Sequence, residues 1–328
     1  MIPFCTLTFD GADSGLVTSH LITATVTLES GGEPDKVEAK LADPGAKLPR
    51  PREGAKILCT IGYKGGNQRT HGPFTVDQYG GSFEEDDGEY LTITGTSVDF
   101  RSGAKNRSTQ SHKDTTLGEI LQKEAGAEGL SAIVSPALAS FPYPHFMRGE
   151  KSVMQMVQEL AEVHDAIEKY KDGAVYFLAR AAGLDLAGNL LSHSLGRDAL
   201  KAWNWTRNFR NTYAGVKASA RDHDKGKRKV KKAPLSKGDA WYEIRKEFPT
   251  EALAETAAAS KAKQLTRAER QIDFTCKCGD PDVLEQVVMS FPGVSPELAG
   301  SWIVTQAVHE FDADAEAYNT SGTAEMKG

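Results

Sequence analysis

The sequence predicts an α+β, β-rich protein in which two small antiparallel β-barrel domains flank an α+β unit, with one helix embedded in the second barrel region. Before residue 110 and after residue 200, short segments alternate apolar with polar side chains between glycine-containing turns, as antiparallel strands do. Between these regions, two capping boxes precede helical apolar stripes. A chain of 328 residues is expected to divide into two or three domains. The predicted domains are residues 1–110, 111–200 and 201–328.

The first region contains five segments with the two-residue period of half-buried strands. From Leu21 to Glu29, threonines alternate with alanine, valine and leucine. The other four segments are 37–41, 57–63, 74–79 and 90–94. Tight turns separate them and no long helical pattern intervenes, which predicts an antiparallel sandwich or small barrel.

Five carboxylates crowd into the turn before the last of these strands, at Glu84, Glu85, Asp86, Asp87 and Glu89. Oxygen ligands of this kind bind hard cations, but their spacing matches no calcium-binding loop. A solvated hairpin tip is the favoured interpretation, because charge clusters beside glycine mark exposed turns.

The middle region changes to helical spacing. Thr116 with Glu119 and Ser152 with Gln155 form capping boxes, and each precedes apolar residues on one helical face. An Asp-Gly dipeptide at 172–173 predicts a tight hairpin. The region is therefore expected to be a small α+β unit.

The last region returns to strand spacing and contains one helix. Expected strands lie at 212–220, 242–246, 272–278, 287–291, 302–311 and 318–326. The alanine-rich segment 250–270 lacks glycine and proline, which predicts a helix of roughly twenty residues. Segment 318–323 lacks apolar alternation, so we expect a weakly packed closing strand.

The charge of the chain is unevenly distributed. Its formal net charge is −6, but residues 221–232 carry seven basic and two acidic side chains, or +5, which leaves −11 for the remainder. We expect this segment to be a loop that is either simply solvated or binds phosphates, an acidic protein surface or anionic lipid. Its possible interaction residues are Lys225, Lys227, Arg228, Lys229, Lys231 and Lys232. The segment contains no aromatic residue, which argues against a platform for single-stranded nucleic acid.

The sequence carries no motif for a nucleophile elbow, a zinc protease, a phosphate-binding loop or a dinucleotide site. Histidine adjoins carboxylate at 164–165, 222–224 and 309–310, but neighbours on a strand point to opposite faces. Cys276 and Cys278 could face one side of a strand as zinc ligands, yet further ligands lie in unrelated segments, so core cysteines are favoured. We expect no catalytic residue, cofactor or metal.

The cysteines and the lengths of the apolar segments indicate the cellular compartment of the protein. Four scattered cysteines are too few for a disulfide framework, which favours free thiols. The first residues lack the pattern of a secretory signal, and no run of about 18 apolar residues occurs. We expect no stable membrane insertion.

Several segments together resemble the phage late control protein D family, the baseplate hub proteins of contractile tails. The strongest match is the segment from Ser111 to Ile120 (SHKDTTLGEI), which is similar to the family's Ser-Trp-x-Asp-Thr-Thr-Leu-Gly-x-Ile element. Further matches, in the same order as in the family, are 72–77, 94–101, 144–145, 160–162, 175–178, 213–218, 279–282, 302–304 and 308–309. The chain departs from the family at 147–152, where members often carry an acidic patch.

The resemblance implies a structural, non-enzymatic hub of a contractile phage tail or tailocin. Such a hub is a homotrimer in which two similar β-barrels per subunit build a pseudo-sixfold surface, so that it adapts the tail tube to the central spike. The implied partners are the tail spike, tail tube, tape measure and other baseplate proteins, and the implied location is the virion tail baseplate, assembled in the host cytoplasm. An acidic body predicts a lumen that does not grip DNA, because like charges avoid phosphate adhesion.

Two alternatives belong to other classes. The spike-hub protein of a type VI secretion system shares this fold but normally continues into a long β-helical spike. A tail-associated cell-wall hydrolase would instead show activity on peptidoglycan.

Overall fold

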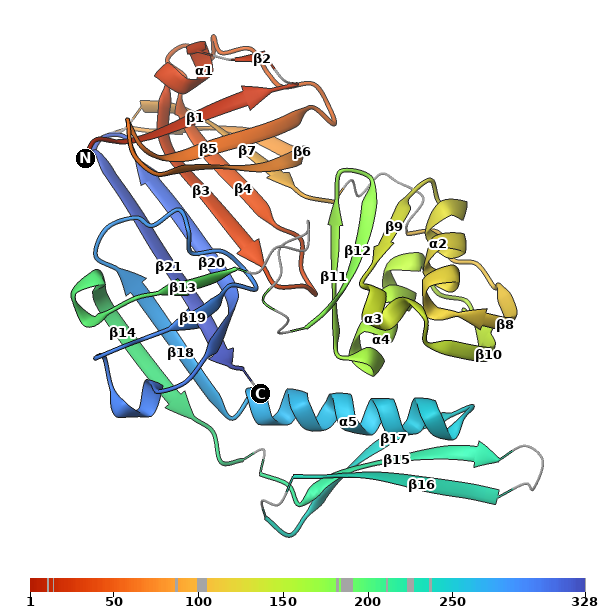
Figure 1. Ribbon diagram of the computed structural model, residues 1–328. Coiled ribbons are helices and arrows are strands. Elements are labelled where there is room, and N and C mark those ends of the chain that lie inside the picture. The colour runs from red at the N-terminus through yellow and green to blue at the C-terminus, as the bar shows by residue number, and fades with distance from the viewer. Residues whose placement is uncertain are drawn as a thin grey trace.

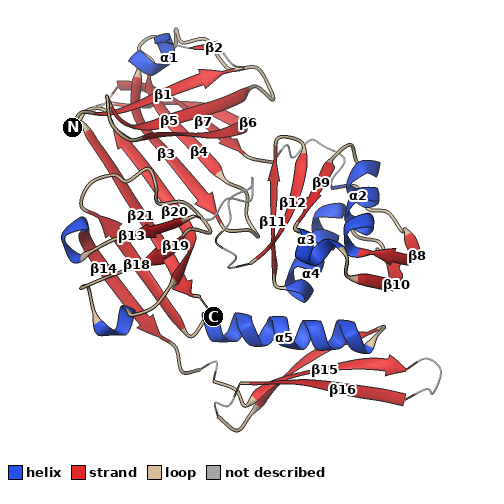
Figure 2. Cartoon of the chain, in the orientation of Figure 1, coloured by secondary structure: helices blue, strands red, loops and turns tan. Residues whose placement is uncertain are grey.

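The structure is a computed structural model that describes residues 1–10, 12–13, 15–85, 88–98, 105–180, 183, 191–210, 212–222, 227–235 and 238–327. Three bodies are visible in Figure 1: a large, mostly antiparallel sheet, an α+β unit beside it, and a small sheet covered by a long helix. The predicted β-rich α+β class is confirmed. Figure 2 shows that most helical residues belong to the second and third bodies.

The large sheet contains 13 strands within the described residues, and it joins the two ends of the chain. Its strands are β1 (Pro3–Phe9), β2 (Ala12–Asp13), β3 (Leu21–Glu29), β4 (Lys36–Ala42), β5 (Lys56–Tyr63), β6 (Gln68–Glu84), β7 (Gly88–Thr96), β13 (Ser192–Ser194), β14 (Leu200–Arg207), β18 (Arg270–Cys276), β19 (Val288–Ser290), β20 (Trp302–Asp312) and β21 (Ala317–Met326). Their main order is β14-β18-β21-β20-β3-β4-β7-β6-β5-β1-β2. The antiparallel β3–β20 pair therefore connects the first and last β-rich regions. Closure of each half into a barrel stays a prediction.

The alternation that predicts the strands also builds the core of the large sheet. In β3, Ala24, Val26 and Leu28 are buried while the intervening threonines are partly exposed. One continuous apolar cluster contains these residues together with Ile272, Trp302 and their neighbours from the last region. The two halves of the sheet therefore share one core.

Strand β21 corrects the expectation of a weak closing strand. It lies inside the sheet, paired with β18 on one side and β20 on the other. Tyr318, Thr320 and Ala324 are buried on its inner face, and the absence of a side chain at Gly322 leaves room for the Phe274 ring. This packing was not predicted from the sequence, because threonine and glycine occupy positions of the strand where apolar residues are usual.

His309 on β20 is a buried histidine with both ring nitrogens satisfied. Its Nδ1 lies 2.8 Å from the Tyr318 hydroxyl and its Nε2 lies 3.0 Å from the Val283 carbonyl oxygen. Burial lowers the pKa of His309 to about 4. The residue is therefore neutral in the folded protein at physiological pH.

We expect a His309→Gln variant to show a weaker pH dependence of stability than the wild type. Below pH 6.5 the unfolded chain protonates this histidine but the fold does not until pH about 4, so the free energy of unfolding falls as the pH drops through this window. By pH 5 the loss is about 2 kcal/mol. Urea unfolding at pH 7.5 and pH 5 measures it, and an identical pH dependence in both proteins would contradict the prediction.

The α+β unit follows the predicted capping boxes closely. It comprises β8 (Ser111–Thr116), α2 (Leu117–Ala127), β9 (Ser131–Val134), α3 (Pro136–Ala139), β10 (Pro142–Met147), α4 (Val153–His164), β11 (Ala166–Lys171) and β12 (Ala174–Ala179). Thr116 with Glu119 and Ser152 with Gln155 make both reciprocal hydrogen bonds, so both capping boxes are confirmed. The 172–173 turn takes positive φ at both residues, as a tight hairpin requires.

The third body consists of β15 (Gly215–Asp222), β16 (Lys227–Pro234), β17 (Trp241–Phe248) and α5 (Glu251–Arg267). Strand β15 pairs antiparallel with β16 and parallel with β17. Helix α5 occupies most of the predicted helix 250–270, and its buried face packs in one apolar cluster with the small sheet and the α+β unit. The short elements elsewhere in the described residues are α1 (Gly15–Ser19) and the 3-10 turns at Arg197–Ala199 and Pro296–Leu298.

The prediction of a loop at 221–232 is wrong for most of that segment. Residues 221–222 continue β15 and residues 227–232 belong to β16, with cross-strand pairs such as Arg221 with Arg228 and Lys217 with Lys232. Lysine residues are accommodated in a strand when their charged groups are paired or solvated. Here Lys229 and Lys231 are paired with Glu251. Lys225 lies outside the described residues.

Candidate functional site

Alternation along β16 divides its basic side chains between two faces of the small sheet. Successive strand residues point to opposite faces, so Lys229 and Lys231 share the α5 side with the buried Ala218 and Ala220 of β15. Arg228 and Lys232 point to the other side. We call that other side, formed by outward residues of β15, β16 and β17, the basic face.

The inward lysines are neutralised within the chain. Lys229 and Lys231 both bind Glu251 at the start of α5, with 3.0 Å between the Lys231 Nζ and Glu251 Oε2 atoms. Hydrogen bonds from these two lysines lower the pKa of Glu251. A carboxylate in the first turn is also favoured by the helix dipole, so these lysines fasten the small sheet to α5.

The outward side chains remain available to a partner. The basic face carries five basic residues and two acidic ones, in the order of the strands Lys217, Arg221, Arg228, Lys232, Glu243, Arg245 and Glu247. Arg228 makes an exposed ion pair of 3.1 Å with Glu243. Val230 lies on the same face with 49% of its surface exposed.

An aromatic ring lies at one end of the basic face. The Nζ atoms of Lys217 and Lys232 lie 5.1 Å and 5.4 Å from the centroid of the Trp241 ring. Such cation–π contacts hold the two lysines over the ring. The segment 221–232 contains no aromatic residue, but the fold supplies one from β17.

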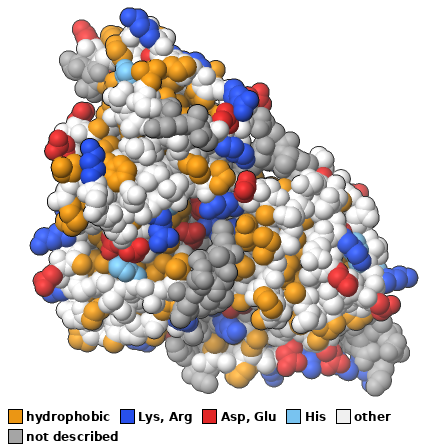
Figure 3. All heavy atoms as spheres, turned by 45° about the horizontal axis from the view of Figure 1, so that its top comes forward, with side chains coloured by type: hydrophobic (Ala, Val, Ile, Leu, Met, Phe, Trp, Pro, Cys, Tyr) orange, Lys and Arg blue, Asp and Glu red, His pale blue; other side chains and the backbone are white. Residues whose placement is uncertain are grey.

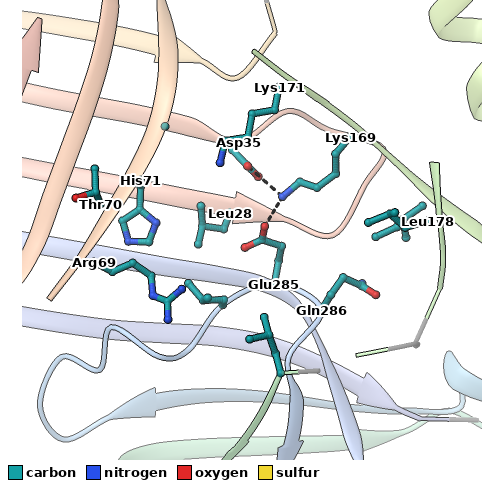
Figure 4. A pocket seen from close by; sticks show the side chains of 14 residues that line it. Leu28, Asp35, Arg69, Thr70, His71, Lys169, Lys171, Leu178, Glu285 and Gln286 are labelled. Atoms are coloured by element: carbon teal, nitrogen blue, oxygen red, sulfur yellow. Dashed lines mark hydrogen bonds and ion pairs between the residues drawn. The ribbon is translucent and has the colours of Figure 1, made fainter. Parts of the chain in front are cut away.

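A second polar site, which was not predicted from the sequence, lies where the α+β unit meets the large sheet. Lys169 on β11 is 6% exposed and lies between Asp35, at 3.0 Å, and Glu285, which it also contacts (Figure 4). Burial alone would lower the pKa of Lys169, but Glu285 and Asp35 raise it above its ordinary value. The lysine is therefore charged, and it links three segments that are far apart in the sequence.

This ion cluster lines a cavity of about 270 Å³. The cavity is also lined by Arg69, His71 and Lys171, as Figure 4 shows. Burial lowers the pKa of His71 to about 3, so this ring is neutral. No local signal in the sequence marks Lys169, because its burial and both of its carboxylate partners arise only from the fold.

A second buried cluster joins α5 to both other bodies. Arg267 binds both carboxylate oxygens of Asp165, the C-cap of α4, and lies 3.2 Å from Glu325 on β21. Burial raises the pKa of Glu325, against the lowering effect of Arg267. The two clusters together fix the α+β unit and α5 on the large sheet.

The histidine–carboxylate pairs of the sequence do not form catalytic pairs. His164 hydrogen bonds to the Tyr143 hydroxyl at 2.6 Å, whereas Asp165 faces Arg267. His309 binds Tyr318 and Val283, and Glu310 is exposed. Residues 223–224 of the third pair lie outside the described residues.

The structure also locates the cysteines and carboxylates considered as metal ligands. Cys276 is buried, but Cys278 lies beyond the end of β18 and is exposed, so the two do not share a face. Asp86 and Asp87 lie outside the described residues. Within the described ranges, no group of three His, Cys, Asp or Glu residues could hold a metal ion.

The molecular surface shows no dominant patch in the view of Figure 3, where basic and acidic side chains are interspersed among scattered apolar ones.

Among the described helices, none is both long and apolar enough to span a membrane. Contacts with other proteins therefore have to be sought in local features such as the basic face.

Comparison with known proteins gives relatives along nearly the whole chain, although no family model matches it. The probable baseplate hub proteins of Escherichia phages P2 and 186 are each 25% identical to the chain, over 94% and 95% of its length and 90% of theirs.

Solved structures show that the fold is shared. A 43 kDa tail protein of prophage MuSo2 from Shewanella oneidensis has a TM-score of 0.69 at 13% identity, covering 99% of this chain and 98% of that one. A tail protein from Neisseria meningitidis MC58 has a TM-score of 0.71 at 11% identity, with 99% and 97% covered. An E. coli component of the type VI secretion system has a TM-score of 0.57 at 10% identity, with 97% and 76% covered.

Proposed function

We propose that the chain is a baseplate hub protein of the late control protein D kind, a homotrimeric symmetry adaptor that joins the tail tube to the central spike. Its likeness to the probable baseplate hub proteins of Escherichia phages P2 and 186 supports this proposal. It is a structural protein of the virion tail baseplate. The observation that carries the adaptor role is the single sheet that unites both β-rich regions through β3 and β20. Because each subunit presents two β-rich regions in a fixed relation, three subunits present six such regions. A hexameric tube requires six contact positions.

The buried ion clusters support a rigid adaptor. Lys169 and Arg267 hold the α+β unit on the large sheet, so a force applied to one body reaches the others. We propose that the functional domains are residues 1–110, 111–200 and 201–328, with the middle domain attached by these clusters. Rigid attachment suits a part that transmits the trigger for tail contraction.

The proposed partners follow from the position of a hub. They are the tail spike on one side, the tail tube on the other, the tape measure protein in the centre and further baseplate proteins outside. The acidic body supports a lumen that does not adhere to DNA. A lumen lined by lysine and arginine in a map of the assembled trimer would contradict this part.

The phage-tail role is favoured over the type VI alternative. The chain covers 90% of the phage hub relatives but 76% of the type VI component. We propose further that the protein makes and breaks no covalent bond.

A cell-wall assay tests the absence of hydrolysis. Purified protein added to peptidoglycan should release no soluble fragments above a buffer control, because the sequence carries neither a nucleophile elbow nor a zinc-protease motif. Lysozyme serves as the positive control. Release of fragments that scales with protein concentration would refute the non-enzymatic role.

Cryo-electron microscopy of the assembled baseplate tests the adaptor itself. The proposal predicts three copies of the chain, with their six β-rich regions facing the tube in a pseudo-sixfold arrangement. Six copies, or a single copy, at this level of the tail would contradict it.

A further inference from the structure

The basic face is an unpartnered sheet surface with mixed character. Helix α5 covers the opposite side of the small sheet, whereas no described element covers the basic face. Val230 is 49% exposed, and Trp241 lies beneath Lys217 and Lys232 at one end of the face. A complementary partner therefore has to offer carboxylates around an apolar side chain.

The β6–β7 hairpin of this chain offers that combination. Residues 77–84 of β6 are all exposed, and Phe83 near the tip has 69% of its surface exposed. Glu84 and Glu85 follow it directly and have no ion-pair partner within the described part of the chain. Phe83 and the two carboxylates together offer the apolar contact and the negative charge that the basic face lacks.

The two surfaces cannot meet within one subunit. In Figure 1, β6 and β7 lie in the upper part of the large sheet, whereas β15 and β16 lie at the bottom, below α5. A contact between them therefore needs two copies. Because the surfaces differ, the contact is heterologous, and repetition around a threefold axis closes it into a ring.

We propose that the basic face of one subunit binds residues 83–85, at the end of β6, in the next subunit. Glu84 and Glu85 pair with Arg228 and Lys232, and Phe83 packs near Val230. This inference rests on the proposed trimer and specifies one contact that holds it together. Glu243 and Glu247 on the same face disfavour a nucleic acid as the occupant, because they repel phosphates.

Charge reversal and its rescue test the contact. The wild type is compared by native mass spectrometry at micromolar concentration with the variants Glu84→Lys/Glu85→Lys and Arg228→Glu/Lys232→Glu. Each variant is expected to weaken trimer formation at least about tenfold, because like charges then face one another. Combining all four substitutions restores opposite charges and should restore the trimer.

Two controls make the result specific. The variant Lys113→Glu/Lys123→Glu reverses two exposed basic residues of the α+β unit and should leave the trimer unchanged. Circular dichroism confirms that every variant is folded. Binding of a fluorescent single-stranded oligonucleotide to the wild type is measured in parallel by anisotropy.

Each outcome of these experiments supports or refutes the proposed contact. A wild type that stays monomeric refutes the proposed trimer and the contact with it, whereas a wild-type trimer that persists in both reversal variants refutes the contact alone. Loss of the trimer without rescue in the fourfold variant refutes the pairing of these two surfaces. Oligonucleotide binding that disappears in Arg228→Glu/Lys232→Glu, with the trimer intact, assigns the face to nucleic acid instead.

Discussion

Replacing Lys169 with Met is expected to lower the free energy of unfolding by about 3–5 kcal/mol. The substitution keeps the apolar stem of the side chain but leaves Asp35 and Glu285 facing one another without a cation at a buried site. An uncompensated buried charge is far more costly than the net value of the ion pair. Urea unfolding monitored by tryptophan fluorescence measures the loss.

Lys171 provides the matched control for this experiment. It lies two residues further along the same strand and lines the same cavity, but it is more exposed. A Lys171→Met variant should stay within about 0.5 kcal/mol of the wild type, as surface substitutions usually do. If Lys169→Met were equally mild, the ion cluster would not fix the α+β unit on the large sheet.

The second large effect is expected at Arg148, which is 1% exposed inside the α+β unit. Its guanidinium donates to Glu124 Oε2 at 2.9 Å and to the carbonyl oxygens of Lys151 and Asn106, both at 2.7 Å. Arg148→Met leaves the buried Glu124 and two carbonyl groups without this donor, so we expect a loss of about 3–5 kcal/mol. Thermal and urea unfolding measure it.

A double variant separates the charge effect from the packing effect. Arg148→Met/Glu124→Leu removes both charges together with the His112–Glu124 hydrogen bond, and should recover part of the stability lost in Arg148→Met, since an apolar replacement of a buried ion pair is often nearly neutral. A double variant less stable than the single one would contradict this account. Arg197→Met, at an exposed position, controls for general effects of losing an arginine.

The regular elements were predictable where local chemistry decides them. The alternation in Leu21–Glu29 and the capping boxes at Thr116 and Ser152 depend on near neighbours in the sequence, and the structure confirms them. The pairing of β3 with β20 was not predictable, because it joins segments about 280 residues apart through a register that no local pattern encodes.

The basic segment shows where a composition argument fails. A run of like charges indicates a solvated loop, but the alternation of β16 places Lys229 and Lys231 against Glu251 and leaves Arg228 and Lys232 outside. The decisive partner comes from a helix twenty residues further on. Lys169 was missed for a similar reason, because both of its carboxylate partners come from distant segments.

Native mass spectrometry of the purified chain, alone and with the cognate spike protein, is the decisive test of the hub role. We expect a trimer of the 35.5 kDa chain that binds a trimeric spike with equal numbers of both subunits. A chain that stays monomeric and never binds the spike would contradict its role as a hub.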